Sequence, residues 1–268
     1  MFAQMKHLAI VSDNLEGMSR FYERVFGMKG TGVLRAGALV VGDGYVGLNI
    51  NPRVPGRQAG FDHFGFEVQD VELVYSRLRT KYPEVRILQR LSNRPFAGVS
   101  THDPAGNVFD LSQQNMENRG DAYVEADREQ KRHVKHLALR AVDPAGLAKF
   151  YRNVFELAEM EKPADDPNFY LSDGKVVFVI MPWDITDFAG TGIERPALDH
   201  IGFKVESVAT LKTELEKVKR ERAVLAPNPT GADAGPEGEA RLKLFAKCPL
   251  GQFHMADPDG VLIDVTDR

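Results

Sequence analysis

The sequence has almost no cysteine. Cys248 is the only one among 268 residues, so a framework of internal disulfides is excluded. The first residues, Met1 to Lys6, also lack the apolar stretch that a secretory signal requires. A reducing, cytoplasmic setting is therefore expected.

Long apolar runs and an excess of basic charge are missing as well. The longest apolar run, Val176 to Trp183, is too short to span a bilayer. The formal net charge is -4 with both signs interspersed, so there is no basic stripe for nucleic acid and no polybasic membrane anchor. We therefore expect a small-molecule partner, no nucleic acid and no membrane, and the sequence leaves homo-oligomer formation open.

What the sequence does contain is an internal duplication. A shift of 129 residues aligns the segment from Lys6 to Phe26 with the segment from Lys135 to Phe155. Two further motifs occur in both copies: Asp62-His63-x-Gly65-Phe66 matches Asp199-His200-x-Gly202-Phe203, and Asp103-Pro104-x-Gly106 matches Asp257-Pro258-x-Gly260. Each copy therefore holds two histidines and a late aspartate, which are side chains that bind metals.

Each copy alternates strand-like and helix-like patterns. Apolar residues recur at helical spacing between Leu15 and Phe26, while Asp62 to Val68 alternates as a strand does. The pattern predicts two β-α-β-β-β units per copy and hence an α+β protein. We expect a first module at 1–115, a linker at 116–133 and a second module at 134–268, each with its own core.

The second copy contains a longer insertion than the first. This insertion, Ala226 to Ala240, is rich in proline and glycine. Such a composition predicts a loop that has no core of its own and that covers a cavity.

Strand alternation places the polar residues of each copy on one face. In the strand from Asp62 to Val68, Phe64 and Phe66 face the helix-covered core, so His63 faces the other side. The same count gives two sets on the face away from the helices: His7, His63 and Asp110 in the first copy, and His136, His200 and Asp264 in the second. Two imidazoles and one carboxylate around a cavity suit Fe(II), Mn(II), Zn or a related divalent ion with open positions.

These motifs resemble the vicinal-oxygen-chelate superfamily, which contains glyoxalases, extradiol dioxygenases, epimerases, fosfomycin-resistance enzymes and bleomycin-binding proteins. The resemblance rests on His-Leu-Ala followed by Phe-Tyr, on Asp-His-x-Gly-Phe, and on the Asp-Pro-x-Gly turn before the last strand. It covers nearly the whole chain apart from the linker. It implies paired β-α-β-β-β units that form a half-open cup around a divalent metal.

The two-module layout is most similar to type I extradiol dioxygenases, in which the C-terminal module holds iron. This resemblance implies Fe(II), or Mn(II), bound by His136, His200 and Asp264, with O2 and a small chelating aromatic or enolisable substrate as reactants. His254 would be the catalytic proton donor, and Ser100 has its place in the first copy. Aspartate stands where the family usually has glutamate, and the first set of ligands is retained as a second candidate site.

Two other functions remain open. A glyoxalase-like isomerase, epimerase or lyase would use Zn, Ni, Co or Mn to polarise a carbonyl, with Glu67 or His254 as the base. A metal-free binding or resistance protein would use the cup to sequester a small molecule. Such a protein has no need for two histidines and an aspartate in register, so the metal-dependent functions are favoured.

Several other side chains are expected to be structural. Core packing is expected of four aromatic residues on apolar helix stripes, Phe21, Tyr22, Phe150 and Tyr151. Arg140 shares a face with His136 and is expected at a solvated strand end or beside an anionic substrate. Cys248 is expected to be a free thiol, because no partner or activating base is evident.

Overall fold

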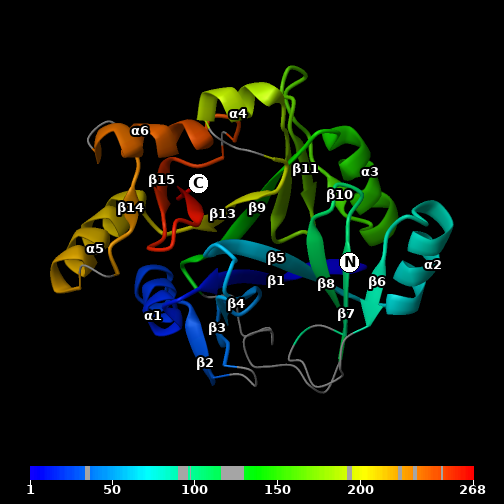
Figure 1. Cartoon of the computed structure of the whole chain (residues 1–268), viewed down its shortest axis with the longest axis horizontal. Coiled ribbons are helices and arrows are strands. Elements are labelled where there is room, and N and C mark those ends of the chain that lie inside the picture. Colours follow the sequence, from blue (N-terminus) through cyan, green and yellow to red (C-terminus); the bar gives the residue numbers. More distant parts are fainter. Residues whose placement is uncertain are drawn as a thin grey trace.

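The computed structural model describes residues 1–33, 37–89, 96, 98–115, 130–191, 195–222, 225–231, 234–248 and 250–268. These residues form two mixed eight-stranded sheets, one from each copy of the duplication (Figure 1). Most of the predicted linker, 116–129, lies outside the described residues. No helix in the described part of the chain is long and apolar enough to cross a bilayer.

The first sheet consists of two β-α-β-β-β units, as predicted. Its strand order is β2-β3-β4-β1-β5-β8-β7-β6, so the first strands of the two units lie side by side in the middle. The elements of the first unit are β1 (Ala3–Ser12), α1 (Leu15–Phe26), β2 (Lys29–Val33), β3 (Leu39–Gly42) and β4 (Gly47–Pro52). Those of the second are β5 (Gly60–Val68), α2 (Val71–Lys81), β6 (Ile87–Gln89), β7 (Val99–His102) and β8 (Val108–Gln113).

The second sheet repeats this arrangement in the order β10-β11-β12-β9-β13-β16-β15-β14. Its first unit contains β9 (His133–Ala141), α3 (Pro144–Phe155), β10 (Ala158–Glu159), β11 (Phe169–Ser172) and β12 (Val177–Pro182), followed by α4 (Ile185–Thr191). Its second contains β13 (Leu198–Lys204), α5 (Val208–Glu221), β14 (Asn228–Pro229), α6 (Gly235–Leu244), β15 (Phe253–Ala256) and β16 (Leu262–Thr266). The described part of the first module has no counterpart of α4 or α6. Strand β9 begins at His133, the last residue of the predicted linker.

The insertion from Ala226 to Ala240 is not a plain loop, contrary to the prediction. It contains β14 and the first part of α6. Asn228 Nδ2 donates to the carbonyl of Asp257 at 2.8 Å, which ties the insertion to the turn before β16. The prediction failed because proline in the first turn is compatible with a helix, so a proline-rich composition does not exclude one.

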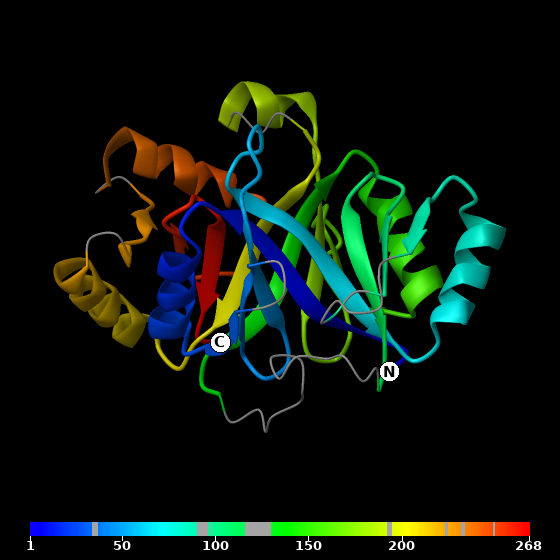
Figure 2. The same cartoon turned by 60° about the horizontal axis from the view of Figure 1, so that its bottom comes forward.

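One hydrophobic core contains residues of both modules, whereas the duplication predicted a separate core for each. A smaller cluster around Val179 and Cys248 belongs to the second module alone. Phe26 of α1 stacks on Phe203 of β13 with ring centroids 3.8 Å apart, and Phe155 of α3 stacks on Phe66 of β5 at 4.5 Å. Helix α1 lies beside α5, and α2 beside α3 (Figure 2). The four aromatic residues predicted for the core are buried in it. Two sheets that are each covered on one face bury more apolar area when their helical faces also pack together.

Two repeated motifs meet across the boundary between the modules. The hydroxyl of Tyr22 donates to Asp257 Oδ2 at 2.9 Å, and the hydroxyl of Tyr151 donates to Asp103 Oδ2 at 2.6 Å. Both acceptors belong to the Asp-Pro-x-Gly turns. Burial raises the pKa of Asp257 to about 7, although backbone N–H groups and the Tyr22 hydroxyl hydrogen-bond its carboxyl group. Each module thus supplies a hydrogen bond to a turn of the other.

Candidate metal centre

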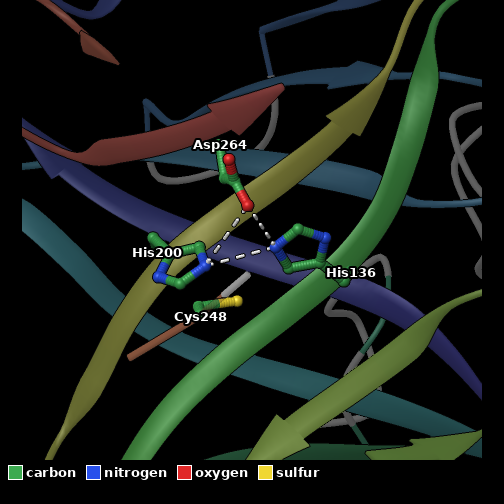
Figure 3. A group of neighbouring side chains, drawn as sticks. All are labelled: His136, His200, Cys248 and Asp264. Carbon is green, nitrogen blue, oxygen red and sulfur yellow. Dashed lines mark hydrogen bonds and ion pairs between the residues drawn. The ribbon is translucent and has the colours of Figure 1, made fainter. Parts of the chain in front are cut away.

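Three neighbouring strands bring the residues predicted as ligands of the second module together. Gly202 of β13 pairs with His136 of β9 on one side and with Asp264 of β16 on the other. His200 lies two residues before Gly202 and on the same face of β13. The side chains of His136, His200 and Asp264 point toward a common centre (Figure 3). Strand register therefore builds this cluster.

Two of the three separations between the donor atoms fit neighbouring ligands of a divalent metal ion, and the third is wider. His136 Nε2 lies 3.2 Å from His200 Nε2 and 3.3 Å from Asp264 Oδ2, and His200 Nε2 lies 4.0 Å from the same oxygen. Nitrogen and oxygen ligands bind such ions at about 2.0–2.2 Å, so two neighbouring ligands stand roughly 3.0–3.5 Å apart. All three side chains are buried.

The carboxylate of Asp264 is incompletely hydrogen-bonded in the described part of the chain. Neither of its oxygens accepts a hydrogen bond from the described residues, although His254 Nε2 lies 3.1 Å from Oδ1. A buried carboxylate whose oxygens accept no hydrogen bond is unfavourable, and a bound cation reduces the penalty. The residues present therefore fit a divalent ion, to which His136 and His200 would offer nitrogen and Asp264 oxygen.

Asp199, the residue before His200, orients the imidazole ring. Its Oδ1 lies 2.5 Å from His200 Nδ1, which favours the tautomer that carries hydrogen on Nδ1 and leaves Nε2 for the metal. In the first module, Asp62 Oδ2 lies 2.9 Å from His63 Nδ1. The repeated Asp-His dipeptide therefore combines a candidate ligand with the residue that orients it.

Arg140 is buried, which corrects the expectation of a solvated strand end or a contact to an anionic substrate. Its Nε donates to Asp199 Oδ2 at 2.6 Å, and its Nη2 donates to the Leu244 carbonyl at 2.6 Å. Nη1 lies 3.3 Å from Asp187 Oδ1 in α4. Helices α4 and α6 cover this end of β9, and the alternation of the strand does not reveal them.

Cys248 is a free thiol, as predicted, but it belongs to the same cluster, which corrects the expectation that it has no partner. Its Sγ and the ligand atoms of His136, His200 and Asp264 all lie within 4.8 Å of one another. Figure 3 shows it beside the two imidazoles. The cysteine was missed because it follows the long insertion of the second copy, where no repeat marks it. The sequence feature that could have indicated its role is its position in the chain between two predicted ligands, His200 and Asp264.

The ionisation of these groups is coupled. Burial opposes a charge on His200, but Asp199 and Cys248 outweigh it and raise the pKa of His200 to about 10. Burial opposes a charge on Asp264 as well, yet His136 and His254 lower its pKa to about 2. Against the effect of burial, the two ligand histidines lower the pKa of the Cys248 thiol to about 6. The centre thus favours positive charge, which a proton or a metal ion can supply.

A cavity of about 600 Å³ lies beside the cluster. It is lined by Leu242, Phe245, Cys248, Gly251 and His254, among others. Because Cys248 and His254 also contact the ligand residues, they stand between those ligands and the cavity. The ring of Phe245 packs against His254 with centroids 4.5 Å apart. His254 therefore lies at the cavity, where the sequence placed it.

The first module contains an equivalent but more exposed cluster. His7 Nε2 lies 3.1 Å from His63 Nε2, which lies 3.4 Å from Asp110 Oδ2. The side chain of His63 is 18% exposed, and the ring of Phe96 stacks on His7 at 4.7 Å. Burial and the neighbouring His63 lower the pKa of His7 to about 3. Burial opposes a charge on His63, but hydrogen bonds to Asp110 and Asp62 raise its pKa to about 9.

The glycines of the repeated motif make room for the histidine on the neighbouring strand. A Cβ at Gly202 would lie 2.0 Å from His136 Cε1. A Cβ at Gly65 would lie 3.1 Å from His7 Cβ and 2.9 Å from a backbone oxygen of Asp110. The Asp-His-x-Gly pattern therefore positions one ligand and leaves space for another.

The fold and the two clusters define a class of protein. Residues 4–111 match the sequence model of the Glyoxalase/Bleomycin resistance protein/Dioxygenase superfamily, and the first module belongs to it. The second module repeats the strand order of the first, so this fold occurs twice in the chain. No curated protein sequence matches the chain.

Solved structures with this fold include oxygenases and a glyoxalase. The 2,2',3-trihydroxybiphenyl 1,2-dioxygenase of Sphingomonas wittichii strain RW1 is 15% identical, with a TM-score of 0.65 over 99% of this chain and 90% of that one. The 2,3-dioxygenase LapB of Pseudomonas sp. KL28 is 17% identical, with a TM-score of 0.64 over 98% and 91%. The Mn(II)-bound glyoxalase of Novosphingobium aromaticivorans is 12% identical, with a TM-score of 0.65 over 98% and 81%. At such identities the likeness establishes the fold and not the reaction.

Proposed function

We propose that the protein is a metal-dependent oxygenase of the vicinal-oxygen-chelate type. His136, His200 and Asp264 would hold Fe(II) or Mn(II), and the substrate would be a small chelating aromatic or enolisable molecule that reacts with O2. The main support is the buried group of two imidazoles and one carboxylate that accepts no hydrogen bond from the described residues, next to a cavity of about 600 Å³. Two histidines and one carboxylate with open positions are typical of non-haem iron oxygenases.

The residues around the ligands prepare the site for this chemistry. When bound, the metal would polarise the substrate and transfer electron density from it to oxygen. Asp199 keeps His200 Nε2 directed at the metal position. Leu242 and Phe245 give the cavity apolar walls.

His254 is the proposed proton donor. It lines the cavity, and its Nε2 lies 3.1 Å from Asp264 Oδ1, so the imidazole connects the ligand cluster with the substrate position. In the first module, Ser100 has the matching place and donates to Asp110. Imidazole exchanges protons near neutral pH and a serine hydroxyl does not. This difference, together with the cavity, favours the second module as the active one.

A glyoxalase-like isomerase, epimerase or lyase is the second candidate. The position of His254 also suits a base that removes a proton from a carbon beside a carbonyl, and a Mn(II)-bound glyoxalase has the same fold. Glu67, the other candidate base, is buried on β5 and belongs to neither ligand cluster. Zn, Ni, Co or Mn would then take the place of iron.

Metal analysis of anaerobically purified protein separates these functions. Wild type, His200→Ala and His63→Ala are compared, because each variant removes one ligand from one cluster. About one equivalent of iron or manganese that is lost only in His200→Ala, with oxygen uptake when catechols are added, supports the oxygenase.

The other outcomes point elsewhere. Zinc or nickel without oxygen uptake would favour the isomerase and lyase reactions. Two equivalents would show that the first module binds metal as well. No metal, even after reconstitution, would contradict both enzyme proposals and favour a binding protein.

A further inference from the structure

Cys248 lies beside all three proposed ligands, although a site with three protein ligands does not need a fourth protein group. Its Sγ lies within 4.8 Å of each of the three ligand atoms, and the residue is 3% exposed. Asp264, fully buried and aimed at the same point, has no hydrogen-bond partner for either carboxylate oxygen among the described residues. One sulfur, two imidazole nitrogens and one carboxylate oxygen around a point make a complete four-coordinate set.

The segment that carries Cys248 is held in place by hydrogen bonds to its backbone. Arg140 Nη2 donates to the Leu244 carbonyl at 2.6 Å. Asn168 Nδ2 donates to the Lys247 carbonyl at 2.6 Å, directly before the cysteine. A ligand on an anchored segment loses little freedom when a metal binds, so the sulfur is positioned in advance.

Charge balance also favours the thiolate as a ligand. With Asp264 alone, a divalent ion would leave one excess positive charge in a fully buried centre. The thiolate of Cys248 cancels this charge, because Asp199 is already paired with Arg140. Uncompensated buried charge is strongly unfavourable. In the first module, His63 is 18% exposed, so water screens the excess there.

We propose that Cys248 is the fourth protein ligand of the resting metal and that a chelating substrate displaces it. This inference rests on the metal centre of the proposed function. When the metal binds, the Cys248 S–H bond is replaced by a sulfur–metal bond, and one proton leaves to solvent.

The displacement is a ligand exchange without electron transfer. A hydroxyl oxygen of the substrate replaces the sulfur on the metal, the sulfur–metal bond breaks, and the hydroxyl proton passes to the sulfur. Cys248 therefore shields the metal until substrate arrives and then accepts a proton that the substrate must lose. Since Cys248 stands between the ligands and the cavity, a substrate in the cavity meets the sulfur first.

The first module provides an internal control. Cys248 is the only cysteine of the chain, so the cluster of His7, His63 and Asp110 cannot receive a thiolate from its own chain. His63→Ala restricts metal binding to the second centre, and His200→Ala restricts it to the first. A signal that is specific for sulfur must then follow the second centre alone.

Cobalt(II) alone tests the ligation. Bound cobalt gives visible absorption bands, and a cobalt–thiolate bond adds a charge-transfer band in the near ultraviolet. Both are expected in wild type and His63→Ala, whereas Cys248→Ser and Cys248→Ala should keep the visible bands and lose the near-ultraviolet band. Circular dichroism confirms that each variant is folded.

Two results would overturn the ligation. One is cobalt bound to His63→Ala without the near-ultraviolet band, and the other is a band that survives in both cysteine variants. In either case only the ligation by Cys248 would be wrong, and the bound cobalt would still support the metal centre of the proposed function. Failure of every variant to bind cobalt would overturn both proposals together.

Thiol alkylation tests the displacement. In His63→Ala without oxygen, bound cobalt is expected to slow alkylation of Cys248 by iodoacetamide roughly tenfold or more, because the lone pair of the thiolate is engaged. Saturating catechol should restore the rate. A rate that stays slow although catechol shifts the visible bands would overturn the displacement.

Discussion

In each cluster, the histidine on the second strand follows an aspartate that holds its Nδ1. Asp199 does so for His200 at 2.5 Å, and Asp62 does so for His63 at 2.9 Å. This contact orients the ring so that Nε2 faces the centre of the cluster, where we propose the metal, and the negative charge raises the basicity of the imidazole. In the Asp-His motif, the histidine is thus the proposed ligand and the aspartate orients it.

Asp199→Asn should weaken metal binding in the second centre by roughly 10–100-fold, because the neutral amide no longer raises the basicity of His200. Competition with a chromophoric chelator, in a His63→Ala background, measures the affinity. Asp62→Asn in a His200→Ala background is the matched control for the first centre. An unchanged metal affinity in Asp199→Asn would contradict this prediction and show that the contact with Asp199 affects only the packing of the His200 ring.

Metal binding in the second centre should strengthen as the pH rises. Despite burial, Asp199 and Cys248 raise the pKa of His200 to about 10, so at neutral pH the metal must displace a proton from this imidazole. Proton competition fades as the pH approaches that pKa. The apparent association constant should therefore rise about tenfold per pH unit for each proton released, between about pH 6 and 9.

Calorimetry in two buffers of different ionisation enthalpy counts these released protons. His63→Ala is the suitable protein, because only the second centre then binds metal. An affinity that stays constant across the pH range, with no proton release, would contradict the prediction.

At the scale of secondary-structure elements, strand pairing rather than loop structure assembles each centre. Gly202 of β13 lies between His136 on β9 and Asp264 on β16. Its missing side chain leaves the space that the His136 ring occupies. Gly65 has the same place in the first module.

Gly202→Ala should therefore damage the second centre more than the fold. Its Cβ would lie 2.0 Å from His136 Cε1 and 2.0 Å from Nδ1, so the imidazole must move. We expect metal affinity to fall at least about tenfold, with a loss of stability of about 1–3 kcal/mol from overpacking. Chelator competition and urea unfolding measure the two effects.

Gly190→Ala is the control for this substitution. Gly190 lies in α4, and a Cβ there would meet nothing within 4 Å. It should leave metal affinity unchanged. If Gly202→Ala binds metal as tightly as Gly190→Ala, the proposed role of the glycine is wrong.

At the scale of the whole molecule, each module donates backbone hydrogen bonds to the other. The backbone N–H of Val134, near the start of β9, donates to Asp43 Oδ2 in the first module at 2.7 Å. The N–H of Met5 in β1 donates to Asp173 Oδ2 in the second module, also at 2.7 Å. Together with the shared aromatic core, these contacts join the two copies in the described structure.

The Tyr22–Asp257 contact across the modules should make stability depend on pH. Burial raises the pKa of Asp257 from 3.8 to about 7, so between these values the folded chain keeps a proton that the unfolded chain has lost. The free energy of unfolding should therefore fall as the pH rises through this window, by at most about 1.4 kcal/mol per pH unit from this group.

Asp257→Asn should make this pH dependence shallower, because the amide does not ionise and its oxygen still accepts from the Tyr22 hydroxyl. Urea unfolding at several pH values in the window measures the slope. Asp103→Asn is the matched variant in the other turn, where burial also raises the pKa of Asp103 beside Tyr151, so it should change the slope in the same direction. Equal slopes in wild type and Asp257→Asn would contradict the assignment.

The sequence by itself determined the β-α-β-β-β units and the two sets of clustered histidines and aspartates. It did so because the face that a residue takes on a strand follows from local backbone geometry, which the alternation records. The duplication then showed the same pattern twice. His7, His63 and Asp110, and their counterparts His136, His200 and Asp264, could therefore be found before the structure was known.

Only the tertiary structure decided which surfaces meet. It placed Cys248 beside the ligands, buried Arg140 under α4 and α6, and joined the modules through one core with Tyr22 and Tyr151 bonded across it. These contacts join residues far apart in the chain, and two of them depend on segments that the first copy does not repeat. No local sequence period indicates these contacts, because they form only when distant segments pack together in the folded chain.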